Sequence, residues 1–297
     1  MLNRTFAHKA FRMNSDRNKG RKNRPDQKGK PKGKFSNERR GKNFKKVGRK
    51  TEPKAADPSI RLNRYLANAG LCSRREADVI IASGAVKIND KVITELGTKV
   101  MPGDVVHYGG EKISGETKRY VLLNKPKDYI TTMDDPQKRR TVMDLVGRAC
   151  KERIYPVGRL DRATSGLLLF TNDGHLAKRL THPSSKVSKT YHVHLDKKVT
   201  KAHLIQLVEE VKLEDGSANV DKAFYQNDGE DKSKIVLELH SGRNRIIRRM
   251  MEALGYKVLR LDRTIFASLT KKNLPRGKYR HLSEAEVGLL HKITGLK

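Results

Sequence analysis

The chain has 297 residues and a formal net charge of +32, from 65 lysines and arginines against 33 aspartates and glutamates. A single-sign excess of this size indicates a polyanionic partner, and nucleic acid is the first candidate. A membrane surface is the rival, but no apolar run approaches the roughly 20 residues of a spanning helix, and no apolar signal core occurs at the N-terminus. We therefore expect a cytoplasmic protein that binds nucleic acid and no membrane.

The two cysteines, Cys72 and Cys150, are far apart in the chain and have no Cys or His at metal-ligand spacing. Neither a disulfide framework nor a zinc site is supported, so we expect reduced thiols and no metal.

Residues 1–58 contain 20 basic and 5 acidic side chains, several glycines and prolines, and few apolar residues. Such a segment cannot bury a core, and we expect a disordered basic tail. A solubilising extension is one interpretation. The single sign of the charge favours the other, an arm that grips RNA without sequence specificity.

The pattern changes at residue 59, where a small folded unit is expected over 59–106. One helix that ends at Gly70 is predicted by apolar residues at helical spacing: Leu62, Tyr65, Leu66 and Ala69. Ser73 and Glu76 form a capping box ahead of a second helix, which closes at Gly84. Alternating apolar residues from Val86 onward predict short strands.

This block resembles the RNA-binding domain named after ribosomal protein S-four. The resemblance rests on Arg61-Leu-Asn-Arg-Tyr-Leu-Ala, Cys72-Ser-Arg-Arg-Glu-Ala and the closing Pro102-Gly-Asp. It implies a helix pair that docks on structured RNA through basic side chains: Arg61, Arg64, Arg74, Arg75 and Lys87. A solvated polar face is the alternative for any charge run.

Residues 107–118 are rich in Gly and Lys and predict a linker into a larger domain over 119–297. Strands and isolated helices alternate irregularly in that domain. This order predicts an α+β fold with a mixed, mostly antiparallel sheet and flanking helices.

The run from Tyr155 to Asn172 places Asp161 between Arg159 and Arg162 and leads into an apolar strand. A carboxylate between two arginines is expected to stay ionised, and the small residues Gly158, Ser165 and Gly166 would let the backbone approach a substrate. An active-site loop and a structural ion pair are both compatible with these residues.

A second candidate is the run from Ser241 to Met251, which follows a strand and opens a helix. It carries four cationic side chains at the start of the helix: Arg243, Arg245, Arg248 and Arg249. Positive charge at a helix N-terminus opposes the helix dipole, and this conflict indicates a function. If Arg248 or Arg249 reaches Asp161, it would orient the carboxylate while the others meet phosphates. An RNA-contacting surface without chemistry is the alternative.

The strand Lys189-Thr-Tyr-His-Val-His194 is the third candidate. His192 and His194 share one face but have no further ligand nearby, so a metal site is not supported. The ring of Tyr191 offers a flat face for a flipped base, although most strand tyrosines pack a core. No phosphate-binding glycine loop or dinucleotide fingerprint occurs. Any chemistry must therefore use one carboxylate.

Together these elements resemble the ribosomal RNA pseudouridine synthases that carry an S-four domain. The motifs are Leu123-Asn-Lys-Pro126, Gly158-Arg-Leu-Asp161 with its Ser165-Gly-Leu-Leu-Leu-Phe continuation, Lys189-Thr-Tyr191, and Gly242-Arg-Asn-Arg-Ile-Ile-Arg-Arg-Met250. Two positions depart from the family pattern. Asp128 stands where a glycine is usual, and Ile246 where Gln or Glu is usual.

The resemblance implies isomerisation of a uridine without cofactor or metal. Asp161 would attack or stabilise the sugar or the base, and a flipped-out base is required because the reacting atoms lie inside a stack. Tyr191 would stack on the base and help to remove the ring proton, and Arg248 would pair with Asp161. The remaining basic residues of these motifs would meet RNA phosphates: Arg159, Arg162, Arg243, Arg245 and Arg249.

The runs Asp134-Asp-Pro-Gln-Lys-Arg-Arg-Thr-Val-Met-Asp144 and Leu180-Thr-His-Pro183 look closer to the large-subunit enzymes of that family, so large-subunit RNA is the expected substrate. We expect a monomer that associates with ribosome assembly intermediates. The competing hypothesis is a non-catalytic RNA-binding or ribosome-assembly factor. It gives no reason for an aspartate in an arginine-rich groove, where a carboxylate repels phosphate.

Overall fold

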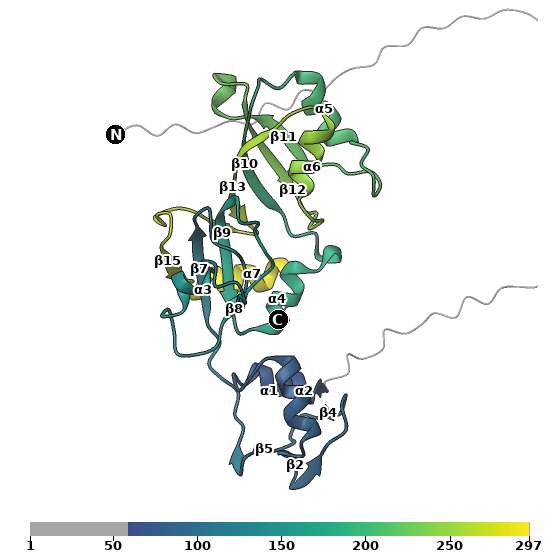
Figure 1. Ribbon diagram of the computed structural model, residues 1–297, viewed down its shortest axis with the longest axis vertical. Helices are drawn as coiled ribbons and strands as arrows, with labels where there is room; N and C mark the ends of the chain where they lie inside the picture. The colour runs from purple at the N-terminus through teal and green to yellow at the C-terminus, as the bar shows by residue number, and fades with distance from the viewer. Residues whose placement is uncertain (1–58, 297) are drawn as a thin grey trace, which may run out of the picture. The chain divides into compact units, whose positions relative to one another are not determined.

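A computed structural model of the protein describes residues 59–296 (Figure 1). The basic tail expected over 1–58 lies outside the described residues. Within the described part, the strands form one two-stranded, one four-stranded and one nine-stranded sheet. The two smaller sheets belong to a small N-terminal domain and the largest to a second domain that carries the cavity described below.

The small domain begins with two helices, α1 (Leu62–Asn68) and α2 (Arg74–Ala82). The predicted capping box is present: the Glu76 amide donates to Ser73 Oγ at 3.3 Å, and the Ser73 amide to Glu76 Oε2 at 2.6 Å. Buried Leu62, Leu66 and Ile81 join the helices into one core with the strands. The strands are β1 (Ile60–Arg61), β2 (Val86–Ile88), β3 (Lys91–Ile93), β4 (Lys99–Val100), β5 (Val106–Tyr108) and β6 (Glu111–Lys112).

The first half of the expected linker over 107–118 belongs to this small sheet. His107 of β5 lies opposite Lys112 of β6, and Ile113 is buried in the core of the domain. Gly109 and Gly110 both have positive φ, 57° and 88°. Two successive residues of this kind form the tight turn that matches the twist of a hairpin. Gly109 and Gly110, which contributed to the prediction of a linker, form the two-residue turn between β5 and β6.

The second domain is built on a sheet of order β11-β12-β10-β13-β9-β7-β15, with β14 beside β13 and β8 beside β9. All its neighbouring strands run antiparallel except β13 and β9, which are parallel. The predicted mixed, mostly antiparallel α+β fold is confirmed. Its strands are β7 (Tyr120–Lys125), β8 (Tyr155–Pro156), β9 (Thr164–Thr171), β10 (Lys189–Leu195), β11 (Lys222–Tyr225), β12 (Lys234–Leu239), β13 (Val258–Phe266), β14 (Leu269–Thr270) and β15 (Tyr279–His281).

Helices cover this sheet in two groups, and Figure 1 shows α5 and α6 beside the half that contains β11 and β12. Leu207 of α5 and Met250 of α6 are fully buried in one core with β10 to β13. Leu176 of α4 and Leu290 of α7 are buried in another, with β7 and β9. The helices are α3 (Met143–Val146), α4 (Gly174–Thr181), α5 (Lys201–Glu209), α6 (Ile246–Ala253) and α7 (Glu284–Thr294). No helix among residues 59–296 has the length and apolar character needed to cross a membrane.

The parallel pair β9–β13 joins the two halves of the sheet, and Gly166 is the residue that permits it. Gly166 lies opposite Arg263 with φ of 116°, a conformation that L side chains rarely adopt. A Cβ at this position would lie 2.5 Å from the Arg263 nitrogen and 2.9 Å from its carbonyl carbon. The expectation that Gly166 lets a substrate approach is therefore wrong, because the neighbouring strand occupies that space.

Gly166→Ala is expected to lower the free energy of unfolding by at least about 2 kcal/mol, since overpacking against backbone adds to an unfavourable φ. Urea denaturation followed by circular dichroism measures this. The control is Gly288→Ala in α7, where a Cβ meets nothing within 4 Å. It should be neutral or stabilising by up to about 1 kcal/mol. Equal stability of the two variants would contradict the packing described for β9 and β13.

Candidate active site

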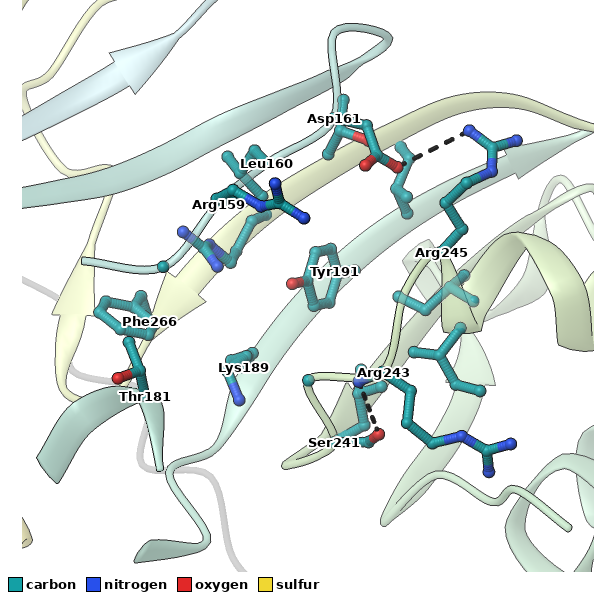
Figure 2. Close-up of a pocket in the computed structure, with 18 of the residues that line it drawn as sticks. Arg159, Leu160, Asp161, Thr181, Lys189, Tyr191, Ser241, Arg243, Arg245 and Phe266 are labelled. Carbon is teal, nitrogen blue, oxygen red and sulfur yellow. Dashed lines mark hydrogen bonds and ion pairs between the residues drawn. The ribbon is translucent and has the colours of Figure 1, made fainter. Parts of the chain in front are cut away.

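A cavity of about 200 Å³ opens where β10, β13, the loop before β9 and the segment before α6 meet (Figure 2). Its lining includes Asp161, Tyr191 and Arg245, which come from three motifs that lie far apart in the sequence. Figure 2 shows Tyr191 between the Asp161–Arg245 pair on one side and Lys189 with Phe266 on the other. This volume is smaller than the roughly 300–1,000 Å³ of sites for drug-sized ligands, and it suits a single ring.

Asp161 is held on an ordered loop. Leu160, immediately before it, is buried, and its backbone exchanges two hydrogen bonds with Thr131 Oγ1, at 2.8 and 3.3 Å. The Asp161 carbonyl accepts from the Thr164 amide at 3.0 Å, where β9 begins. The side chain itself stays 38% exposed. The backbone is thus fixed while the carboxylate remains accessible from the cavity.

Asp128 anchors the far side of the same loop and explains one departure from the family pattern. It has a positive φ of 69°, the conformation that favours glycine at this position. Its amide donates to the Arg162 carbonyl at 2.9 Å, and its carboxylate lies 3.3 Å from Arg162 Nε. Arg162, which was expected to contact RNA, is therefore paired with Asp128 in this structure.

The basic partner of Asp161 is Arg245. Arg245 Nη1 lies 3.8 Å from Asp161 Oδ2, and Figure 2 shows the two side chains pointing toward one another. The prediction that Arg248 pairs with Asp161 is wrong in this structure. Arg248 is buried and donates to the carbonyls of Val258 at 3.1 Å and Ala163 at 3.3 Å. Burial, followed by the charge of Arg245, lowers the pKa of Arg248, while Asp161 acts in the opposite direction.

Two further arginines of this segment bind one acid. Arg243 Nη2 lies 2.5 Å from Asp215 Oδ1, and Arg249 Nη1 lies 3.0 Å from Asp215 Oδ2. Hydrogen bonds from Arg249 first, and then from Arg243, lower the pKa of Asp215 to about 2. Asp215, together with the Val258 and Ala163 carbonyls that accept from Arg248, thus offsets the positive charge crowded at the start of α6. Arg249 does not reach Asp161.

Lys125 lies directly behind the Asp161 loop, although the sequence suggested no role for it beyond its place in a motif. Its side chain is fully buried, and Nζ donates to the carbonyls of Pro126 and Thr164, both at 2.9 Å. Burial lowers the pKa of Lys125 to about 8, and the carboxylates of Asp128 and Asp161 oppose this shift. The feature of the sequence that could have pointed to Lys125 is a lysine at the end of an apolar strand.

The pH dependence of folding should report Lys125. Its pKa is about 8 in the folded protein against 10.5 for an unperturbed lysine, so the unfolded chain binds the proton more tightly. Stability therefore rises with pH across this window. Between pH 7.5 and 9.5 the unfolding free energy of the wild type should gain about 1 to 2 kcal/mol relative to Lys125→Met. Urea titrations at both pH values measure the gain. If the unfolding free energies of the wild type and Lys125→Met differ by the same amount at both pH values, the lowered pKa of the buried Lys125 amine is contradicted.

The floor of the cavity is formed by side chains from β10 and β13. Tyr191 lies opposite Arg263, and Lys189 opposite Phe266. The register shifts between the two pairs, and all four residues line the cavity. The Tyr191 hydroxyl has no hydrogen-bond partner within residues 59–296. Burial, and then the charge of Arg263, lower the pKa of Lys189 to about 8. The sequence suggested no role for Arg263. The feature that could have pointed to it is a cationic residue at a buried position of an alternating strand.

The other predicted site residues divide into two groups. Arg159, Arg243 and Arg245 line the cavity. The basic residues of the small domain are exposed or half-buried on β1, α1, α2 and β2. Their role as RNA contacts stays a prediction: Arg61, Arg64, Arg74, Arg75 and Lys87. Among the described residues, no group of three or more His, Cys, Asp or Glu side chains could hold a metal ion.

Both domains of the chain match family models. Residues 119–253 match the family model described as RNA pseudouridylate synthase, and residues 60–106 match that of the S4 domain. The chain is 40% identical over 236 residues to the ribosomal large subunit pseudouridine synthase B of Bacillus subtilis (strain 168), covering 79% of this chain and 96% of that protein. It is 38% identical over 240 residues to an uncharacterized RNA pseudouridine synthase of Aquifex aeolicus (strain VF5), covering 80% and 96%.

A crystal structure of a pseudouridylate synthase aligns with a TM-score of 0.56 and 28% identity, over 78% of this chain and 99% of that one. The two relatives match over nearly their whole length, and both domain models match in the order in which the domains occur. The chain belongs to the RNA pseudouridine synthases and carries an S4 RNA-binding domain ahead of its catalytic domain.

Proposed function

We propose that this enzyme isomerises a uridine of ribosomal RNA, in the large subunit, with Asp161 as the catalytic carboxylate. The observation that carries the proposal is the placement of an accessible carboxylate at a small cavity, 3.8 Å from one guanidinium and beside a tyrosine ring. The large-subunit assignment is supported by the similarity to the Bacillus subtilis enzyme of that name.

In the proposed reaction a uridine leaves its stack and enters the cavity, where the ring of Tyr191 covers one face of the base. Asp161 acts on the sugar or the base, and the C1′–N1 bond breaks. The uracil turns, C5 bonds to C1′, the C5 proton is lost and N1 gains a proton. Atoms and electrons balance within the nucleoside, so the step requires no oxidant or reductant.

The arginines have separate tasks in this scheme. Arg245, which is 47% exposed, holds the Asp161 carboxylate before the substrate arrives. Arg248 acts as a positioning residue, because its bond to the Ala163 carbonyl fixes the loop two residues after Asp161. Arg159, which is exposed and lines the cavity, meets the RNA backbone phosphates, which adds salt-sensitive affinity.

A non-catalytic RNA-binding or assembly factor is the alternative function for this chain. An accessible carboxylate at a cationic cavity weakens phosphate binding, which a pure binding module has no reason to accept. The test is purified full-length protein incubated with ribosomal RNA from a strain lacking the gene, with chelator and without nucleotide or reductant. We expect pseudouridine at a defined site, read by carbodiimide-dependent primer-extension stops. Tight RNA binding without any new stop would support the binding module.

A further inference from the structure

Arg263 is a buried cation at the cavity whose charge the proposed mechanism has not used. It is 3% exposed, Nε donates to the Leu167 carbonyl at 2.8 Å, and the guanidinium carbon lies 4.7 Å from the centroid of the Phe266 ring. Within residues 59–296, Nη2 is buried without a hydrogen-bond partner and no carboxylate pairs with Arg263. A buried guanidinium left in this state is costly, and a ligand that accepts its hydrogen bonds would account for it.

The strand register places Arg263 beside the surface on which the base would stack. Residues directly opposite in an antiparallel pair have Cβ atoms about 5 Å apart on the same face, and Arg263 lies opposite Tyr191. A ring stacked on Tyr191 would therefore lie beside Arg263. The other cation of this floor, Lys189, already donates to the His240 carbonyl at 2.8 Å and the Val187 carbonyl at 3.2 Å.

We propose that Arg263 is a catalytic residue that donates hydrogen bonds to a uracil oxygen and stabilises the negative charge of the detached base. The proposal rests on the proposed function. When the C1′–N1 bond breaks, its electron pair stays on N1 and spreads onto O2 and O4. When C5 then bonds to C1′ and loses its proton, N1 is protonated and the ring is neutral again. The guanidinium gains or loses no proton in this sequence.

Location distinguishes this role from phosphate binding. Arg159 and Arg245 are exposed on loops at the cavity, where a charged RNA backbone can reach them, whereas Arg263 lies on a central strand. A neutral uracil gains little from the buried charge, but its anion gains much. Arg263 should therefore affect turnover and leave RNA affinity nearly unchanged.

The test compares Arg263→Met with the wild type in single-turnover reactions on ribosomal RNA from a strain lacking the gene. We expect the rate to fall about 10²- to 10³-fold with the dissociation constant for RNA within about threefold. Arg263→Lys keeps the charge without the planar fork, and its single-turnover rate should lie between those of the wild type and Arg263→Met. The matched control is Arg260→Met, an exposed arginine on the same strand, whose rate should equal that of the wild type.

A second substrate separates catalysis from misfolding. Large-subunit RNA transcribed with 5-fluorouridine carries a base whose anion the fluorine already stabilises. Because fluorine replaces the C5 hydrogen, no proton leaves C5 and the product ring keeps its fluorine. The reaction is therefore followed as loss of 5-fluorouridine from nucleoside digests. The loss of rate in Arg263→Met relative to the wild type should be smaller on this RNA than on normal RNA.

An equal deficit on both RNAs, or a wild-type rate for Arg263→Met, would overturn this role and leave the proposed function standing. A wild-type protein that converts neither RNA would overturn both.

Discussion

Asp161→Asn is expected to abolish uridine isomerisation, with a loss of at least about 10³-fold in single-turnover rate. The amide keeps the shape of the side chain but loses the charge that would attack or stabilise the reacting sugar or base. The loop is held by backbone contacts of Leu160 and Asp161 with Thr131 and Thr164, which the substitution leaves in place. The protein should therefore fold and bind RNA as before. Primer extension after carbodiimide treatment measures the loss.

Asp134→Asn is the control for this prediction, because Asp134 is exposed and its side chain makes no hydrogen bond or ion pair within the described residues. It should modify RNA at the wild-type rate. Wild-type conversion by Asp161→Asn would refute the carboxylate assignment. The alternative function would then gain support only if the wild type were also inactive.

Tyr191→Phe is expected to lower turnover by about 10²-fold, within the range of a lost acid–base group, with RNA affinity within about threefold of the wild type. The phenyl ring still stacks on the base, but the hydroxyl that would help to remove the C5 proton is gone. That hydroxyl bonds to nothing within residues 59–296, so its removal leaves no buried partner unsatisfied. Quantifying pseudouridine in nucleoside digests over time gives the rate.

The control here is Tyr279→Phe on β15, which removes a hydroxyl that likewise makes no hydrogen bond within the described residues. Its turnover should not change. If Tyr191→Phe also turns over at the wild-type rate, Tyr191 is a stacking residue only, and the proton leaves by another route.

Local rules predicted much of the fold. The capping box at Ser73 and Glu76 identified α2, and residue alternation identified β10, because these signals lie within a few residues of one another. The parallel pairing of β9 with β13 and the short strand β15 were not predicted. Both depend on partners about a hundred or more residues away, and a three-residue strand carries little pattern of its own.

The site shows the same division. The motifs predicted that Asp161, Tyr191 and an arginine of the run from Ser241 to Met251 come together, since residue type and order carry that information. They predicted the wrong arginine, Arg248, where the structure has Arg245. Arg245 precedes α6 in a left-handed conformation with φ of 46°, and Arg248 lies one turn inside the helix among backbone carbonyls. An arginine does not favour the left-handed region, so the sequence gives no sign of this turn.

The most direct measurement is a map of pseudouridine in ribosomal RNA from a strain in which the gene is deleted and then restored. We expect one large-subunit site to lose pseudouridine on deletion, to regain it with the wild-type gene, and to stay unmodified with Asp161→Asn. An unchanged pseudouridine map after deletion, or full restoration by Asp161→Asn, would contradict the proposed reaction and its carboxylate.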